Sequence, residues 1–250
     1  MKSKISLAVI GGTGVYRLTG IEWLESISSN SEYGPISGPI RIAEIEGKRI
    51  AFLARHGESH SLPPHQVNYR ANLKALVQLG VEKVLAINTV GGITPAFGPR
   101  VLAVPDQIID YTWGRLSTFW EEPNPTVLHV DFAEPYTPSL RQQLLQACAI
   151  AEVPVVDGGC YGATQGPRLE SKAEIQRLQR DGCDLVGMTG MPEAGLAREL
   201  GLSYASLCVV ANWAAGCDSQ NREITLAEVL ANVESVSSHL LPIITAMVRK

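Results

Sequence analysis

Residues 5–14 read Ile5-Ser6-Leu7-Ala8-Val9-Ile10-Gly11-Gly12-Thr13-Gly14, an apolar run that ends in glycines. A run of this length that is stopped by glycine predicts a short buried strand followed by a tight turn. The N–H groups of that turn, together with the Thr13 hydroxyl, could hold a phosphate group. A turn without any ligand is the plainer interpretation when the motif is taken alone.

These glycines do not form a dinucleotide-binding fingerprint. After Gly12 and Gly14, the G-x-G-x-x-G spacing requires a glycine at position 17, where the chain has Arg17. No Lys-Ser or Lys-Thr pair follows the glycines as it would in a P-loop. The failed glycine spacing, together with the lack of a suitable acidic residue after a second strand, argues against a nicotinamide-dependent oxidoreductase.

Further apolar runs alternate with helical patterns, which indicates an α/β fold with a mostly buried, mixed β-sheet and helices on both faces. We predict a single domain over residues 1–250. The predicted strands are 5–10, 41–46, 49–54, 84–87, 101–104, 153–156, 185–186 and 204–210, with a turn at Gly47. The predicted helices are 68–79, 139–151, 170–181, 192–200 and a last long helix from Thr225, its N-cap, to the C-terminus.

The composition excludes several classes of protein. The net charge is −4 and no run of Lys or Arg exceeds two residues, so we expect no nucleic-acid partner. Residues 1–10 meet glycine before an apolar stretch of signal-peptide length forms, and no later segment reads as membrane-spanning, so we expect a cytoplasmic protein without a membrane partner. The five cysteines are odd in number and widely spaced, which predicts neither a disulfide framework nor a thiolate metal site.

Polar side chains follow four of the predicted strands. They are Thr13, Arg55 with His56, Thr89, and Thr189. Strand ends meet at one edge of a sheet, where a phosphate would need such donors, and the guanidinium of Arg55 is a planar fork suited to phosphate oxygens. Each motif is weak alone, but together they predict one phosphate site.

Three histidines within ten residues, His56, His60 and His65, raise the alternative of a metal site. The intervening Pro63-Pro64 breaks helical register, and loop histidines are commonly ordinary hydrogen-bonding groups. We therefore predict no metal. The segment from Pro105 to Pro135 carries two tryptophans and little periodicity, which is typical of a lid or a contact surface.

Taken together, the motifs resemble one known family, the trimeric purine nucleoside phosphorylases and methylthioadenosine phosphorylases. The resemblance extends from about residue 5 to about residue 245. The matching motifs, in the family's order, are Gly11-Gly12-Thr13-Gly14, Arg55-His56-Gly57, Val67-Asn68-Tyr69-Arg70-Ala71-Asn72, Gly166-Pro167-Arg168, Met188-Thr189 with Pro192-Glu193, and Tyr204-Ala205-Ser206.

The resemblance implies a nucleoside phosphorylase fold with a partly barrel-like sheet. It also implies a homotrimer that uses inorganic phosphate as co-substrate and needs no metal or organic cofactor. In the family, the residues matching Thr13, Arg55, His56, Thr89 and Thr189 bind phosphate with help from the main chain at the position of Val90, and the residue matching Met188 lies against the ribose.

On the purine side this chain departs from the methylthioadenosine enzymes, which have aspartates at the positions of Asn212 and Ala214 and a small hydroxyl residue at that of Glu170. Asn212 can donate to O6 and N7 of a 6-oxopurine, while Glu170 can accept from its N1–H. We expect Leu169, beside Glu170, among the substrate-binding residues. The alternative is that Glu170 only stabilises the N-terminus of a helix.

On the sugar side, Leu226 stands where the inosine and guanosine enzymes have a histidine for the 5′-hydroxyl, and Val229 and Leu230 follow one turn later. These side chains suit a methylthio group, although they could simply be the core stripe of the last helix. His129 matches a methylthioadenosine-enzyme residue near the same pocket.

Combining the two ends, we hypothesise phosphate-dependent cleavage of 5′-methylthioinosine to hypoxanthine and 5-methylthioribose 1-phosphate. The candidate catalytic residues are Asn212, Glu170 and His56. Three alternatives stay open: a phosphorylase for inosine and guanosine, a methylthioadenosine phosphorylase, and a nucleoside-binding module without catalysis.

Overall fold

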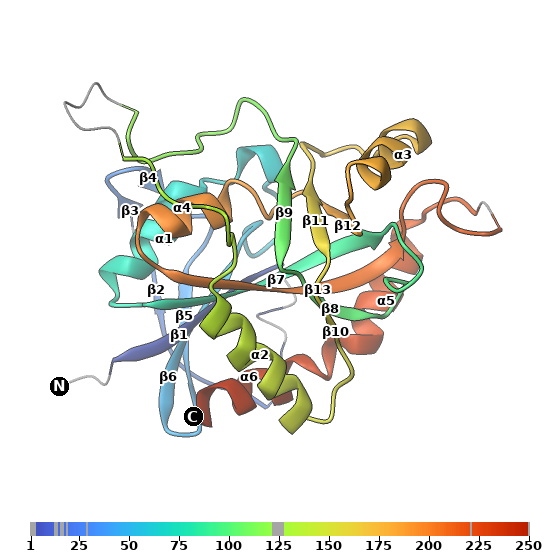
Figure 1. Ribbon diagram of the computed structural model, residues 1–250. Coiled ribbons are helices and arrows are strands. Elements are labelled where there is room, and N and C mark those ends of the chain that lie inside the picture. The colour runs from blue at the N-terminus through green and yellow to red at the C-terminus, as the bar shows by residue number, and fades with distance from the viewer. Residues whose placement is uncertain are drawn as a thin grey trace.

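The computed structural model describes residues 4–12, 15, 18, 20–28, 30–121, 128–220 and 222–249. Thr13, a predicted phosphate ligand, lies outside the described residues. Figure 1 shows a large twisted sheet with helices on both of its faces, as predicted.

Most of the described strands join one mixed sheet. Its main path is β10-β8-β13-β7-β1-β6-β5-β2, and β12, β11 and β9 branch from β7. Their bounds are β1 Ile5–Gly11, β2 Glu22–Ile27, β5 Ile40–Ile45, β6 Lys48–Ala54, β7 Lys83–Gly92, β8 Leu102–Val104, β9 Gln107–Asp110, β10 Val156–Asp157, β11 Cys160–Ala163, β12 Leu185–Gly187 and β13 Ser203–Trp213. A separate pair is formed by β3 (Asn30–Ser31) and β4 (Gly34–Pro35).

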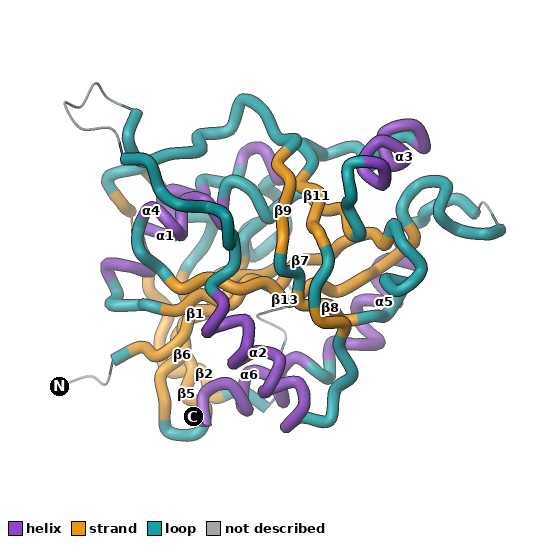
Figure 2. Tube along the Cα trace, in the orientation of Figure 1, coloured by secondary structure: helices purple, strands orange, loops and turns teal. Residues whose placement is uncertain are grey.

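Helices cover both faces of the sheet. On one face α1 (Tyr69–Gln78) packs with α4 (Glu193–Glu199), after the short 3₁₀ helix η2 (Pro64–Gln66). The other face carries α2 (Pro138–Ile150), α5 (Leu226–Ser237) and α6 (Leu240–Arg249), while α3 (Lys172–Arg180) lies over the branch. In Figure 2 the longer loops gather at the side where β9 and β11 end, opposite α2 and α6.

The buried sheet explains why its strands are apolar without a break. In β1, Leu7 and Val9 point into the core on the α2 and α6 face, whereas Ala8 and Ile10 point into the core on the α1 and α4 face. When both faces are covered, each position along a strand meets apolar side chains, so polar alternation disappears.

Local signals placed several elements correctly. Thr225, predicted as an N-cap, caps α5 by accepting from Glu228 N at 3.2 Å. The helix predicted over 68–79 is α1, in which Asn68 is the N-cap and accepts from Ala71 N at 3.1 Å. The turn between β5 and β6 has Gly47 at φ +69°, a conformation that glycine adopts freely.

Other boundaries were wrong. The strand predicted at 84–87 continues to Gly92, because it pairs along its length with β13 and then with β12. The strand predicted at 153–156 covers only Val156–Asp157. Five strands were missed: β2, β9 and β11 of the large sheet and the separate pair β3 and β4. No residue of β2 or β9 is buried, β11 contains Gly162, and β3 and β4 have two residues each.

The predicted last helix is two helices, α5 and α6, separated at residues 238–239. Contrary to the expectation from sequence, the stretch Leu226–Arg249 is long and apolar enough to cross a membrane by length and composition, with 33% of the window buried inside the structure. Ile243 and Ile244 of α6 lie in the core against the sheet, as in the core helix of a globular fold.

We expect Ile243→Ala to lower the free energy of unfolding by about 2–5 kcal/mol, because it opens a cavity where the side chain is 0% exposed. The matched change on α5, Leu230→Ala, removes a side chain that is 59% exposed and should cost below about 1 kcal/mol. Urea unfolding of both variants measures the difference, and equal costs would contradict this packing of α6.

Candidate functional site

The predicted strand-end residues do meet at one edge of the sheet. The four strands β6, β1, β7 and β13 are parallel neighbours in this order. Gly11 ends β1 opposite Ala54 of β6, and Arg55 N donates to Gly11 O at 2.7 Å. The motifs around Gly11, Arg55 and Thr89 therefore lie side by side, as a shared site requires.

Thr89 is unusual among the residues of β7. It is the one exposed position of that strand, whose other residues are buried apart from the half-buried Lys83 at its start. Val90, directly after it, is 2% exposed. A hydroxyl opened to solvent from the middle of a buried strand marks an accessible polar surface at this edge of the sheet.

The Arg55 guanidinium is held by a buried carboxylate. Its Nε and Nη2 donate to the two oxygens of Glu193, at 2.7 and 2.8 Å, and Nη1 donates to Ile87 O at 3.3 Å. Tyr204 Oη donates to the same carboxylate at 2.9 Å. Burial alone would lower the pKa of Arg55, but the charge of Glu193 raises it above its ordinary value. Arg55 is therefore a fixed cation, and only some of its guanidinium N–H groups are left to bind another anion.

His56 is 9% exposed, and its Nδ1 lies 2.8 Å from Leu62 O. A carbonyl oxygen only accepts, so Nδ1 carries the proton and Nε2 of the neutral ring is an acceptor. Burial first, and then the charge of Arg55, lower the pKa of His56 to about 4. At neutral pH His56 thus offers an acceptor, which suits a protonated phosphate oxygen, and not the second donor that the sequence suggested.

Thr189 joins the same edge through a buried amide. Its hydroxyl donates to Asn88 Oδ1 at 2.9 Å, and Asn88 Nδ2 donates to Ser206 Oγ at 2.7 Å. The chain of hydrogen bonds ties the loop after β12 to β7 and β13. Arg55, His56, Thr89, Val90 and Thr189 are therefore brought into one region of the fold.

The Glu170 carboxylate is anchored from outside the helix that follows it. Thr164 Oγ donates to Glu170 Oε1 at 2.6 Å. The α3 helix is capped by Ser171 and by Glu174, which form a reciprocal capping box. The alternative that Glu170 serves the helix N-terminus is thus wrong, and its second carboxylate oxygen is left for another donor.

Asn212 lies where the sheet register changes. The pairing of β13 with β7 shifts between Val210 and Asn212, and Asn212 Nδ2 donates to Trp213 O at 2.7 Å. One N–H of the amide and its oxygen are thereby left over. A cavity of about 20 Å³ borders Asn212 and is lined also by Glu228 of α5.

Met188 is packed against the loop that leads to Glu170. Gly166 has φ +60°, and a Cβ built at this position would lie 2.4 Å from Met188 Sδ. Only glycine therefore allows the thioether to occupy this place. Leu169, in the same loop, is 51% exposed.

Leu226, Val229 and Leu230 of α5 are not part of the core stripe of this helix. Leu226 and Leu230 are 73% and 59% exposed, and Val229 is half-buried, which overturns that alternative. These residues are free to line a pocket.

His129 does not join them within one chain. Its segment is held at the other end of the molecule, where Gln107 and Arg198 donate to the carbonyls of Ala133 and Glu134. Figure 1 shows α4, which carries Arg198, on the opposite side of the molecule from α5. A pocket shared by His129 and Leu226 would need a second copy of the chain.

The described residues contain no group of three or more His, Cys, Asp or Glu side chains that could hold a metal ion. The His60 ring packs on the His56 ring, with centroids 4.7 Å apart. A cavity of about 210 Å³ lies at the amino ends of β1 and β7, lined by Ser6 and Lys83 among others, and so faces away from the strand ends described above.

A family model described as the phosphorylase superfamily matches residues 6–249. The chain belongs to this superfamily. It is 62% identical over 248 residues to a probable S-methyl-5′-thioinosine phosphorylase of Xanthomonas campestris pv. campestris, covering 99% of this chain and 98% of that one. It is 40% identical over 247 residues to the 6-oxopurine nucleoside phosphorylase of Pyrococcus furiosus, covering 97% and 91%.

Among solved structures, the methylthioadenosine phosphorylase from Schistosoma mansoni in complex with adenine matches with a TM-score of 0.92 and 30% identity, covering 98% of this chain and 91% of that one. The expected nucleoside phosphorylase fold is thereby confirmed. This member of the phosphorylase superfamily is a pentosyltransferase-type enzyme.

Glu193 and Thr164 of this phosphorylase were not assigned to the site from the sequence. Glu193 stands in an otherwise apolar stretch after Pro192, which is a signal for a paired buried charge. Thr164, which holds Glu170, carries no sequence signal, because a threonine at a strand end is common.

We expect Glu193→Gln to lower the free energy of unfolding by about 3–5 kcal/mol, because it leaves the buried Arg55 cation without its counter-charge. Tyr204→Phe removes one hydrogen bond to the same carboxylate and should cost less, about 1.5–3 kcal/mol. Urea unfolding compares the two variants. A Gln variant no less stable than the Phe variant would show that the charge of Glu193 is not needed.

His56 predicts a pH dependence of stability. Its pKa is about 4 in the folded protein, below the ordinary value of 6.5, so its contribution to stability is complete above pH 6.5 and is lost as the pH falls toward 4. His56→Asn keeps a donor for Leu62 O without titrating. The wild type should lose up to about 3 kcal/mol more than this variant between pH 7 and pH 4, measured by urea unfolding. Parallel curves for the two proteins would refute the lowered pKa.

Proposed function

We propose that the protein cleaves S-methyl-5′-thioinosine with inorganic phosphate, giving hypoxanthine and 5-methylthioribose 1-phosphate. The observation that carries the proposal is the Glu170 carboxylate, anchored by Thr164 and left out of the helix cap. A carboxylate accepts from the N1–H of a 6-oxopurine, whereas N1 of adenine is itself an acceptor. An unpaired buried acceptor costs about 1–3 kcal/mol, so this group favours hypoxanthine over adenine.

The relatives support the same base and sugar. Probable S-methyl-5′-thioinosine phosphorylases of Xanthomonas campestris pv. campestris and Pseudomonas syringae pv. tomato are 62% and 53% identical to this chain. On the sugar side, the exposed Leu226 and Leu230 with Val229 offer an apolar surface to a methylthio group. Burial of such a group contributes about 0.8 kcal/mol per carbon, whereas a 5′-hydroxyl would lose its hydrogen bonds there.

In the proposed reaction the phosphate lies at the edge formed by Arg55, His56, Thr89 and Thr189, with the Val90 main chain, and Thr13 stays a further ligand that the family resemblance implies. Arg55 supplies the fixed positive charge, and Nε2 of neutral His56 accepts a hydrogen bond from a protonated phosphate oxygen. Phosphate attacks C1′ from the face opposite the purine while the glycosidic bond breaks through an oxocarbenium-like state. The configuration at C1′ is inverted.

Charge that develops on the departing purine is stabilised by Asn212, through the N–H that Trp213 O does not take. Glu170 and Leu169 orient the ring, and Met188 lies against the sugar. A hydrogen bond to a charged group is worth about 1.5–3 kcal/mol, so Asn212 contributes roughly 10- to 100-fold to the rate.

The proposal also covers the oligomeric state and the cellular location of the protein. A homotrimer would bring His129 of one copy toward α5 of another, which agrees with their separation within one chain. The chain would act as a single domain in the cytoplasm, with phosphate as co-substrate and no metal or organic cofactor.

We expect S-methyl-5′-thioinosine to have a higher kcat/KM than inosine or methylthioadenosine when phosphate-dependent release of free base is measured. Leu226→His should raise the preference for inosine over methylthioinosine by about fivefold or more, because it replaces an apolar contact by a partner for the 5′-hydroxyl. Leu24→His, at a 45% exposed leucine on β2, serves as the control and should leave the ratio unchanged.

The outcomes separate the rivals. Methylthioadenosine as the best substrate would refute the roles of Glu170 and Asn212, and inosine as the best substrate would refute the role of Leu226. Absence of phosphate-dependent cleavage would leave a nucleoside-binding module.

A further inference from the structure

Arg115 occupies a position that the reaction described above does not use. It lies in the long connection after β9, and its guanidinium donates to four main-chain carbonyls. The bonds are Nη1 to Met188 O at 2.9 Å and Met191 O at 2.6 Å, and Nη2 to Thr164 O at 3.2 Å and Gln165 O at 2.8 Å.

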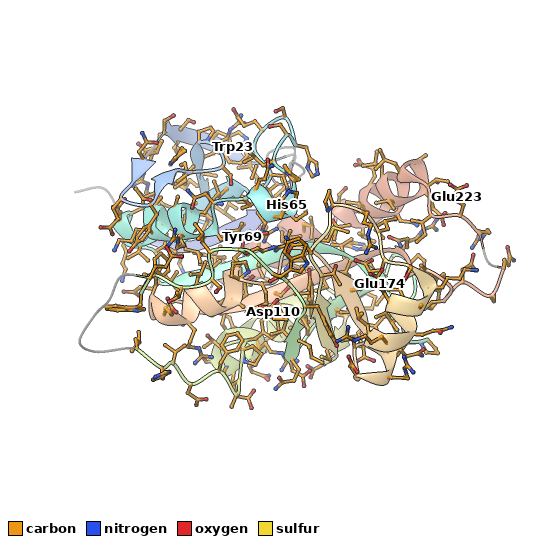
Figure 3. All side chains as sticks on the ribbon, turned by 90° about the horizontal axis from the view of Figure 1, so that it is seen from above. Trp23, His65, Tyr69, Asp110, Glu174 and Glu223 are labelled. Atoms are coloured by element: carbon orange, nitrogen blue, oxygen red, sulfur yellow. The ribbon has the colours of Figure 1, made fainter. Side chains whose placement is uncertain are left out.

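Two further groups complete the surroundings of Arg115. Nε donates to Gln165 Oε1 at 3.2 Å, and Nη1 lies 3.4 Å from Tyr69 Oη. The guanidinium carbon lies 5.8 Å from the centroid of the Tyr69 ring, a cation–π geometry. In Figure 3, Tyr69 lies near the middle of the molecule, between His65 and Asp110. Each nitrogen of the planar group thus has a partner.

The four carbonyls belong to two different loops. Thr164 and Gln165 begin the loop between β11 and α3, which carries Glu170. Met188 and Met191 flank Thr189 in the loop between β12 and α4. One rigid guanidinium therefore joins the loop on the purine side to the loop on the phosphate and sugar side.

We propose that Arg115 is a positioning residue that sets the spacing between these two loops and so between the purine and phosphate ends of the site. The proposal rests on the proposed function, in that Glu170 and Thr189 are assigned to opposite ends of one substrate complex. Five N–H donors in one plane are needed to reach both loops at once. A lysine ammonium has three donors at one point and satisfies one loop at a time.

Arg70 provides a matched control. It holds the same connection further along, where Nη1 donates to Thr118 O at 3.3 Å and to Glu121 Oε2 at 2.6 Å, and it lies over the Tyr33 ring. These contacts of Arg70 reach neither of the two site loops. A general need to anchor the connection would make the two arginines equivalent.

Hydrogen exchange of the ligand-free protein tests the structural part. Arg115→Met should raise amide exchange in both 164–170 and 188–191, whereas Arg70→Met should raise it mainly near 116–121. Arg115→Lys retains the charge and is the milder change, and it should raise exchange in at least one of the two site loops. This variant decides the question if Arg115→Met does not fold. Unchanged exchange in both loops would overturn the proposal.

Steady-state kinetics test the positioning part. Arg115→Met should raise KM for both phosphate and the best nucleoside, with kcat/KM falling by about tenfold or more, because both binding ends are displaced. Arg115→Lys should raise at least one of the two KM values, because a lysine holds one loop at a time. Arg70→Met should leave both KM values within about twofold of wild type. A lower kcat with both KM values unchanged would indicate only a smaller folded fraction and would overturn the proposal.

The two proposals fail separately. If wild-type protein cleaves no nucleoside, the proposed function fails, and the exchange comparison still decides whether Arg115 orders the loops. If wild type is active and the Arg115 variants behave as Arg70→Met does, only the role of Arg115 is lost.

Discussion

The buried ion pair between Arg55 and Glu193 is the contact on which the site depends. Arg55 follows β6 and Glu193 opens α4, and their side chains are 2% and 1% exposed. A charge buried so deeply requires its partner, and breaking such a pair costs more than forming it contributes. The pair therefore acts chiefly as a geometric constraint: it holds the start of α4, and the loop with Thr189 before it, against the strand ends.

Around this pair, hydrogen-bond direction decides what the edge can bind. Leu62 O accepts a hydrogen bond from His56 Nδ1 and so fixes the proton there, and Asn88 Oδ1 accepts the hydrogen bond of the Thr189 hydroxyl. Two groups that sequence reasoning treats as donors thus present acceptors beside a fixed cation. An anion that carries a proton of its own, as phosphate does near neutral pH, suits this combination better than a fully ionised one.

In the proposed function, discrimination among nucleosides would rest on two separate surfaces. At the purine end, the Glu170 carboxylate held by the Thr164 hydroxyl would select by donors and acceptors. At the sugar end, the exposed Leu226 and Leu230 of α5 would select by burial of apolar surface. Because the two surfaces lie on different elements, either one could change without the other.

The sequence by itself determined the features that depend on near neighbours: the apolar strands such as β1, the cap at Thr225, and the polar residues at strand ends. These were predictable because propensity and periodicity act over a few residues. Tertiary structure alone decided the partners of those residues. The short strands β9 and β11 exist only because they pair with each other and with β12, and Arg55 and Glu193 are 138 positions apart. Contacts of that range, like those of Arg115 with two loops, arise from how the chain is folded, and no local pattern encodes them.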